Sequence, residues 1–203
     1  MKIEYIEYGE GAVMIRIPIL SFGCSGPCLT ILSGDHGDEY VGIQILQRFT
    51  NLLNEEKLAG RIRIITSVNS VAHSLGNRVS PFDGMDLNRV KSGDSSGSLT
   101  MRLANTLMRY LSDSDLVVDL HNFEMRSPIT IGYAVHHHVE VDNKMHEILK
   151  VFRPEYVWKI DNDEIISVAL SERGIPNFIV ETSDLKDVSD DETTTADISE
   201  IRD

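Results

Sequence analysis

Two histidines and a glutamate in this chain have the residue types of a metal-binding site. His36 and Glu39 lie in Gly-Asp-His-Gly-Asp-Glu (residues 34–39), and His121 ends the later run Asp-Leu-His. A catalytic zinc ion usually takes three protein ligands of these types and keeps one position open for water, whose pKa it lowers. A His-x-x-Glu pair alone is common by chance, so the position of these residues in the fold decides what the pair means.

The candidate ligands lie beside the ends of expected strands. Residues 28–33 and 116–120 are short apolar runs typical of buried strands, and they stop just before His36 and His121. Apolar residues at three- and four-residue spacing predict a helix over 38–53, with Glu39 in its first turn. Because open α/β sheets bind ligands outside the carboxyl ends of their strands, we expect one zinc ion held by His36, Glu39 and His121.

Glu181 follows a third apolar run, residues 176–180. A carboxylate beside an activated water can take its proton and pass it to a leaving nitrogen, which is the requirement of metal-assisted hydrolysis. The alternative is a solvated glutamate after an edge strand. The repeated strand-end position favours the catalytic role.

Arginines lie between the two metal-binding segments. Arg78 precedes the run Asp-Gly-Met-Asp-Leu-Asn-Arg (residues 83–89), which has no helical or strand period. Arginine suits the binding of a carboxylate or of charge that develops on a carbonyl oxygen. On a chain of net charge −13, positive groups at this place favour an anionic substrate. A turn stabilised by Asp86 and Asn88, with both arginines solvated, explains the same residues, and the sequence leaves both interpretations open.

These motifs, in this order and spacing, resemble the succinylglutamate desuccinylase/aspartoacylase family, a branch of the zinc carboxypeptidase superfamily. The resemblance runs from about residue 27 to residue 182. It implies that His36, Glu39 and His121 bind zinc and that Glu181 is the general base. It further implies that Arg78 polarises the scissile carbonyl and that Asn88 and Arg89 hold a substrate carboxylate.

The chain departs from the family pattern at three places. Ser70 stands where the family often has proline after asparagine, and Arg89 is followed by Val-Lys-Ser-Gly where Phe-Pro-Gly is common. Glu181 is followed by Thr182 and Ser183, where many members have a glycine nearby. We therefore expect the substrate loop and the surroundings of the base to differ from those of the family.

The composition agrees with one domain over residues 1–183. A chain of 203 residues, 41% of them hydrophobic, can bury one sizeable core. The family commonly continues into a smaller β-rich region, so residues 184–203 are expected to be an acidic tail or the truncated start of such a region. The negative charge excludes nucleic acid and anionic membrane surfaces as expected partners, because both favour clusters of lysine and arginine. No signal peptide or membrane span is predicted, so cytoplasm is the expected location, and a homo-oligomer stays open.

The remaining pattern predicts an α/β fold with a mixed, mostly parallel sheet flanked by helices on both faces, as in zinc carboxypeptidases. Further strands are expected over residues 3–8, 13–20, 61–68 and 129–135, the first two as an antiparallel edge. Further helices are expected over residues 99–111, 141–152 and 164–173.

Together these observations predict a zinc-dependent amidohydrolase for an N-acyl amino acid or a similar small anionic amide. Two alternatives stay open. One is a zinc carboxypeptidase that acts on a peptide or peptidoglycan fragment, since the same metal core serves both reactions. The other is a zinc-binding domain that binds a ligand without hydrolysing it, which the unusual residues after Arg89 favour.

Overall fold

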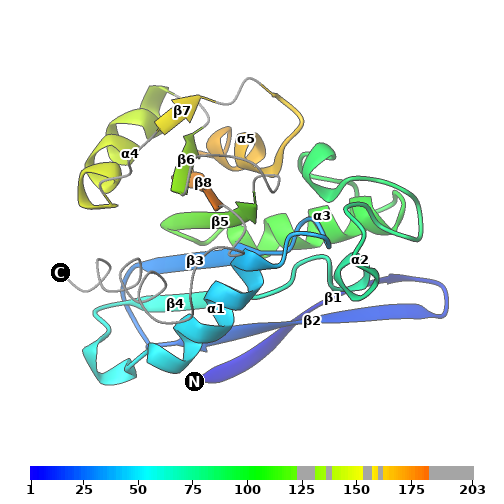
Figure 1. The fold of residues 1–203 in the computed structure, drawn as a ribbon, viewed down its shortest axis with the longest axis horizontal. Helices are drawn as coiled ribbons and strands as arrows, with labels where there is room; N and C mark the ends of the chain where they lie inside the picture. The colour runs from blue at the N-terminus through cyan, green and yellow to red at the C-terminus, as the bar shows by residue number, and fades with distance from the viewer. Residues whose placement is uncertain (123–130, 136–138, 153–156, 160–161, 183–203) are drawn as a thin grey trace.

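A mixed sheet of eight strands forms the centre of the molecule (Figure 1). The computed structural model describes residues 1–122, 131–135, 139–152, 157–159 and 162–182. The strands follow each other in the sheet in the order β1-β2-β4-β3-β5-β8-β6-β7. Their bounds are β1 Lys2–Glu10, β2 Val13–Phe22, β3 Cys28–Ser33, β4 Arg61–Ile65, β5 Leu116–Asn122, β6 Ile131–Val135, β7 Val157–Lys159 and β8 Asn177–Thr182.

The strands at the centre of the sheet are parallel and the N-terminal edge is antiparallel. Strand β3 pairs in parallel with β4 and β5, and β5 pairs in parallel with β8. Strand β1 pairs antiparallel with β2, and β2 with β4. The predicted fold class and antiparallel edge are therefore confirmed. Because β3, β5 and β8 run in one direction, their carboxyl ends meet at the same edge of the sheet.

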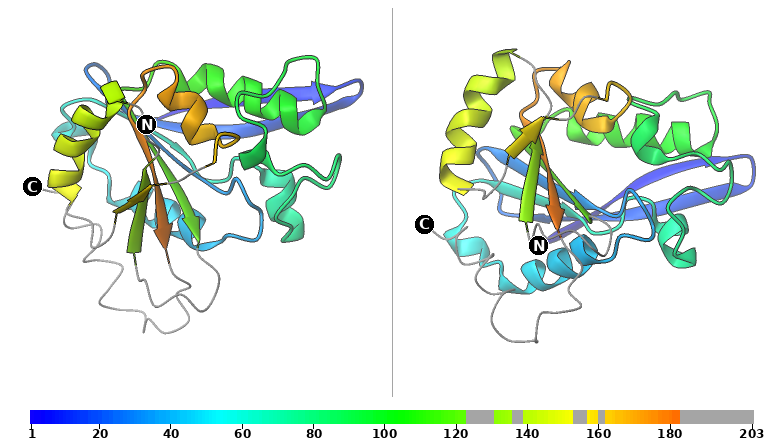
Figure 2. Two further views of the ribbon diagram at one scale, coloured as in Figure 1. Left: turned by 90° about the horizontal axis from the view of Figure 1, so that it is seen from above. Right: turned by 45° about the horizontal axis from the view of Figure 1, so that its top comes forward.

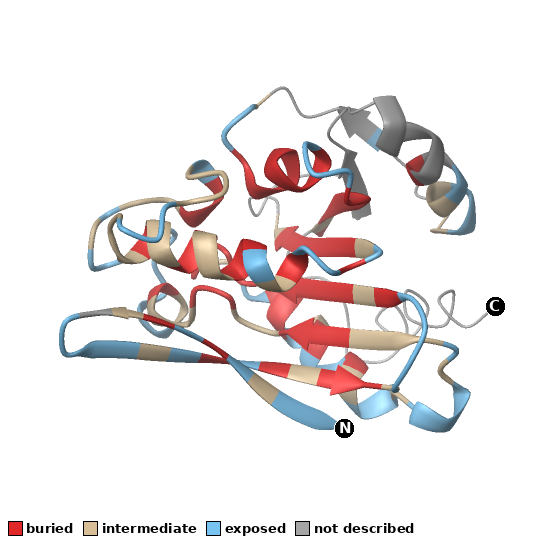
Figure 3. Ribbon diagram, turned by 180° about the vertical axis from the view of Figure 1, so that it is seen from behind, coloured by how far each residue is buried: buried red, intermediate tan, exposed pale blue. Residues whose placement is uncertain are grey.

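Helices cover both faces of the sheet (Figure 2). On one face, α3 (Leu99–Leu111) and α5 (Ile166–Ser171) enclose a hydrophobic cluster with β1, β2 and β5. On the other, α1 (Val41–Leu52) and α4 (Val139–Phe152) enclose a second cluster that includes Leu46, Met145 and Phe178. Buried residues concentrate in the central strands and on the helix faces turned to them (Figure 3). None of the described helices is long and apolar enough to cross a membrane.

Three predicted boundaries were wrong in ways that affect the site. Strand β5 continues to Asn122, so His121 lies inside the strand and not after its end. Helix α1 begins at Val41, so Glu39 lies in the loop before the helix and not in its first turn. The backbone N–H of Glu39 donates to the carbonyl of His36, which closes a turn ahead of the helix. Strand β8 continues to Thr182, because β6 pairs with its last residues, and Glu181 therefore lies inside the strand.

Several short elements were not predicted from the sequence pattern. Helix α2 (Ser70–Leu75) spans only six residues, too few to show a period. Asn69 caps its start through its side-chain oxygen, and Gly76, with a φ of 63°, ends it in the left-handed conformation. The short 3₁₀ helices η1 (Glu55–Lys57) and η2 (Leu87–Arg89) were also not predicted. Residues 184–203 and the start of the strand expected over 129–135 lie outside the described residues.

Asp83 holds the start of α3 from a distant loop. Its carboxylate accepts hydrogen bonds from the backbone N–H of Thr100, at 2.9 Å, and from the Thr100 hydroxyl, at 2.7 Å. Ser98, the residue that precedes the helix, makes no side-chain cap. Partial burial alone would raise the pKa of Asp83, but the hydrogen bonds from Thr100 and Ser98 outweigh it and lower the pKa.

We expect Asp83→Ala to lower the free energy of unfolding by about 1 kcal/mol, because a helix end loses its cap. The folded-state pKa is lowered, so this stabilisation is present above about pH 4, the usual aspartate pKa, and is lost as the pH falls further. Urea unfolding at pH 7 and at pH 3 measures both effects. Asp94→Ala is the control, because the exposed Asp94 carboxylate accepts hydrogen bonds from Ser96, two residues along the chain. Equal stability of the wild type and Asp83→Ala at pH 7 would contradict the role of Asp83 as a cap.

Candidate metal centre

A loop between β3 and α1 presents His36 and Glu39 at the carboxyl edge of the sheet. Gly34 starts this loop with a φ of 76°, a conformation that other residues adopt only at a cost. Gly37 lies against α2, where an added Cβ would come within 2.1 Å of the backbone of Ala72. Only glycine permits this approach. The two glycines of the motif therefore fold the loop back toward the sheet.

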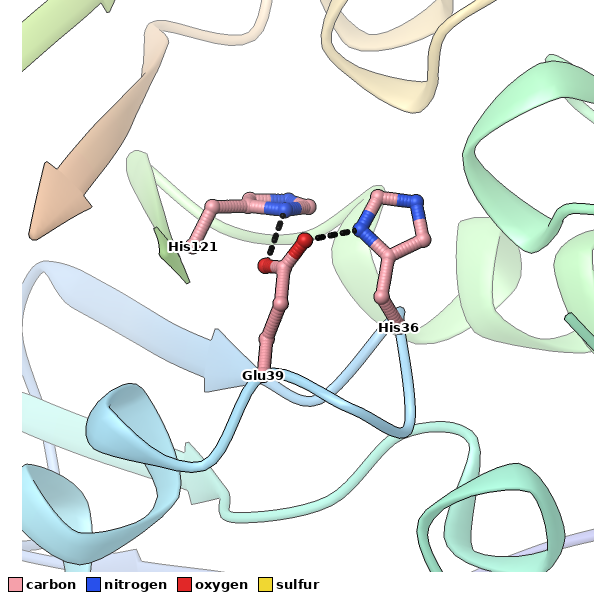
Figure 4. A group of neighbouring side chains, drawn as sticks. All are labelled: His36, Glu39 and His121. Carbon is pink, nitrogen blue, oxygen red and sulfur yellow. Dashed lines mark hydrogen bonds and ion pairs between the residues drawn. The ribbon is translucent and has the colours of Figure 1, made fainter. Parts of the chain in front are cut away.

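The carboxylate of Glu39 lies between the two imidazole rings (Figure 4). Its Oε1 atom is 2.6 Å from Nδ1 of His36, and its Oε2 atom is 3.0 Å from Nδ1 of His121. Both histidines are buried, and the ligand atoms of the three side chains lie within 4.8 Å of one another. The structure thus brings together the three residues that the sequence predicts as metal ligands.

A second carboxylate faces the other nitrogen of each ring. Nε2 of His36 is 3.0 Å from Oδ1 of Asp86, and Nε2 of His121 is 3.1 Å from Oδ2 of Asp119. A carboxylate only accepts hydrogen bonds, so each Nε2 carries the proton that it donates. Each Nδ1 faces Glu39 in the same way, so a cation bound between these side chains would replace the Nδ1 protons and take the Nδ1 lone pairs. Such carboxylate partners fix the orientation and the tautomer of metal-binding histidines.

The carboxylates shift the pKa values of the group. Burial opposes the charged form of His36, but the hydrogen bonds to Asp86 and Glu39 outweigh it and raise the pKa to about 9. Burial likewise opposes the charge of His121, yet the negative charge of Asp119 and the hydrogen bonds raise its pKa well above the usual value. Burial alone would raise the pKa of Glu39, and its hydrogen bonds to His121 and His36 lower it instead. Positive charge is therefore favoured between these side chains.

Glu181 lies beside His121 on the neighbouring strand. The two residues are direct partners in the parallel register of β5 and β8, so their side chains leave the sheet on the same face. Glu181 is partly buried, and this burial raises the pKa of its carboxyl group. A carboxyl with a raised pKa is a better proton acceptor than an ordinary surface glutamate.

Arg78 reaches the group from the loop after α2. Its Nη1 atom is 3.2 Å from Oε1 of Glu39, and its Nε atom is 3.5 Å from Oδ2 of Asp86. The side chain is 45% exposed, so one side of the guanidinium faces solvent while the other contacts the site. Arg78 is therefore placed where a bound molecule can meet it.

Asn88 and Arg89 lie in η2, directly after Asp86. Asn88 is buried, and its side-chain oxygen accepts a hydrogen bond from the backbone N–H of Ile166, at 3.0 Å. Its Nδ2 group is thus the part of the amide left to donate. Arg89 is exposed, and its Nη1 donates to the backbone carbonyl of Asn88. The turn is held at both ends, because Asp86 also binds the backbone N–H of Asn88.

The sequence analysis did not assign a role to Asp86 or Asp119 in the metal site. Alternation along a strand was a usable signal for Asp119, because residues two apart point to the same face, and Asp119 precedes His121 by two. No such signal existed for Asp86. Its contact with His36 joins loops that are 50 residues apart in the sequence.

Comparison with known proteins shows the family of this chain. A model of the succinylglutamate desuccinylase/aspartoacylase catalytic domain matches residues 25–197. An N-alpha-acetyl-L-2,4-diaminobutyric acid deacetylase from Halomonas elongata is 33% identical over 89% of this chain and 61% of its own length.

Two solved structures are also similar. A succinylglutamate desuccinylase/aspartoacylase from Rhodobacter sphaeroides has a TM-score of 0.79 at 25% identity, over 89% of this chain and 57% of its own. An aspartoacylase family protein from Mesorhizobium loti has a TM-score of 0.77 at 28% identity, over 89% of this chain and 60% of its own. The chain thus spans less than two thirds of the length of these relatives. Since the family match covers most of the chain, the protein belongs to the succinylglutamate desuccinylase/aspartoacylase family.

Proposed function

We propose that this chain carries the active site of a zinc-dependent amidohydrolase that removes an acyl group from an N-acyl amino acid. The observation that carries the proposal is the carboxylate of Glu39 between two Nδ1 atoms, with Glu181 in register beside His121. The deacetylase relative acts, by its name, on an N-acetylated amino acid, which supports this substrate class over a peptide. N-acetyl amino acids, including N-alpha-acetyl-2,4-diaminobutyrate, are the first compounds to test.

The donor set of the site fits zinc. Two imidazole nitrogens and one carboxylate oxygen are the donors of many catalytic zinc sites, and the carboxylates behind the rings hold both Nδ1 atoms toward Glu39. We therefore assign one zinc ion to His36, Glu39 and His121. When bound there, zinc supplies Lewis acidity, which lowers the pKa of water and polarises a carbonyl group.

The residues around the metal site carry out the proton transfer, the stabilisation of charge and the binding of the substrate. Glu181 accepts the proton of the attacking water and returns it to the leaving nitrogen, for which its raised pKa suits it. Arg78 donates to the oxygen of the scissile carbonyl as negative charge develops there. Asn88, through Nδ2, and Arg89 hold the substrate carboxylate, and the bond from Ile166 keeps the Asn88 amide oriented. The cytoplasmic location and the oligomeric state stay predictions from the sequence.

We expect Glu181→Gln to lower kcat by about 10²- to 10⁴-fold, because glutamine cannot accept the proton. Zinc binding should be unchanged, since Glu181 is not a proposed ligand. Steady-state hydrolysis of N-acetyl amino acids, together with elemental analysis of zinc, measures both. Glu56→Gln is the matched control, because Glu56 is exposed in η1. Unchanged turnover of Glu181→Gln with zinc bound would remove Glu181 from the mechanism.

We expect Asp86→Asn to weaken zinc binding by about 10- to 100-fold, because His36 loses the charged partner that orients its ring. Asparagine can still accept the hydrogen bond from Asn88, so the turn should persist. Competition with a chromogenic chelator measures the affinity, and circular dichroism checks the fold. In the control Asp94→Asn, the affinity should equal that of the wild type. An equal affinity in Asp86→Asn would mean that Asp86 does not support the metal ligand.

A further inference from the structure

Asp35 is a buried carboxyl group that the proposed reaction does not use. The residue is 1% exposed, and neither oxygen of its side chain has a hydrogen-bond partner among the described residues. It directly precedes His36, one of the proposed zinc ligands. An ionised carboxylate in the protein interior is strongly unfavourable unless a positive group or several hydrogen bonds compensate it.

Asp119 adds a further unpartnered oxygen at the same place. Its Oδ2 atom is engaged with Nε2 of His121, whereas Oδ1 has no hydrogen-bond partner in the described part of the chain. One ligand atom of Asp35 and one of Asp119 lie within 4.8 Å of each other, in a group that also includes His121. Asp35 and Asp119 together thus hold three buried carboxylate oxygens with no partner among the described residues, close to His121.

The carboxyl groups of Asp35 and Asp119 are close enough to bind one cation together. Two oxygens that bind one divalent ion at 2.0 to 2.6 Å each lie up to about 5 Å apart on its opposite sides. The ligand atoms of Asp35 and Asp119 lie within 4.8 Å of each other, which allows this arrangement.

No described side chain of the zinc site donates a hydrogen bond to Asp35. Glu39 faces the two Nδ1 atoms and Arg78, and Asp86 faces His36 and Arg78. The single N–H of His121 already serves Oδ2 of Asp119. The positively charged and hydrogen-bond-donating groups of the zinc site are thus paired with carboxylates other than that of Asp35.

We propose that Asp35 and Asp119 form a second cation site, separate from the zinc site and without a ligand in common with it. Carboxylate oxygens are the donors that Mg²⁺ and Mn²⁺ prefer, whereas the histidines favour zinc at the first site. The second ion neutralises the buried carboxylates, and through Asp119 it holds the ring of His121 in its orientation. The two sites select different metals because their donor atoms differ.

Manganese titration of the zinc-loaded protein tests this proposal. Mn²⁺ is added to protein that holds one zinc ion per chain, with hours of incubation because the oxygens are shielded from solvent. Electron paramagnetic resonance then measures the free ion. The wild type is expected to bind one Mn²⁺ per chain, and Asp35→Asn to bind it at least tenfold more weakly. Asp38→Asn removes the same charge from an exposed position of the same loop and should bind Mn²⁺ as the wild type does.

Absence of Mn²⁺ binding in the wild type, or equal binding in Asp35→Asn, would overturn the second site. If Asp35→Asn does not fold, anomalous diffraction from Mn²⁺-soaked wild-type crystals decides, since it must show a peak between Asp35 and Asp119. The zinc content of His36→Ala is measured in parallel. Zinc retained in that variant would contradict the proposed zinc site, whereas the manganese result bears on Asp35 alone, so the two failures can be told apart.

Discussion

The orientation of two buried imidazole rings is the constraint on which the site depends. Both Nδ1 atoms must point at Glu39, and a free imidazole would rotate away from that direction. Asp86 and Asp119 prevent the rotation by accepting from the Nε2 atoms. Each carboxylate is itself held, Asp119 by the pairing of β5 with β3 and β8, and Asp86 by the turn of η2. The sheet thus supplies one side of the site and the loops the other.

The same arrangement concentrates negative charge at the carboxyl edge of the sheet. Five carboxyl groups, those of Asp35, Glu39, Asp86, Asp119 and Glu181, influence one another or the two histidines there. Arg78 forms ion pairs with two members of this cluster, Glu39 and Asp86. Such a cluster is stable only with cations or protons among its members. The electrostatics of the site and its affinity for metal ions therefore have the same cause.

Sequence patterns predicted the strands and the three candidate ligands because both are local features. The apolar runs before His36, His121 and Glu181 are strands in the structure, and their parallel order brings the three residues to one edge. The exact place of Glu39 was not predictable in this way. A helical period cannot show that the close contact of Gly37 with α2 keeps residues 36–40 in a loop. Contacts between distant loops, such as that of Asp86 with His36, produce no periodic pattern in the sequence.

The turn at η2 connects the metal side of the site to the strand that carries Glu181. Asp86 binds His36 at one end of the turn, and Asn88 receives the N–H of Ile166 at the other. Ile166 begins α5, which packs on β8, the strand of Glu181. A shift of the turn would therefore disturb the ring of His36 and the start of α5 together. The same packed elements thus connect the groups proposed to bind the metal, to accept the proton and to hold the substrate carboxylate. This packing fixes the relative positions of these groups before a substrate binds.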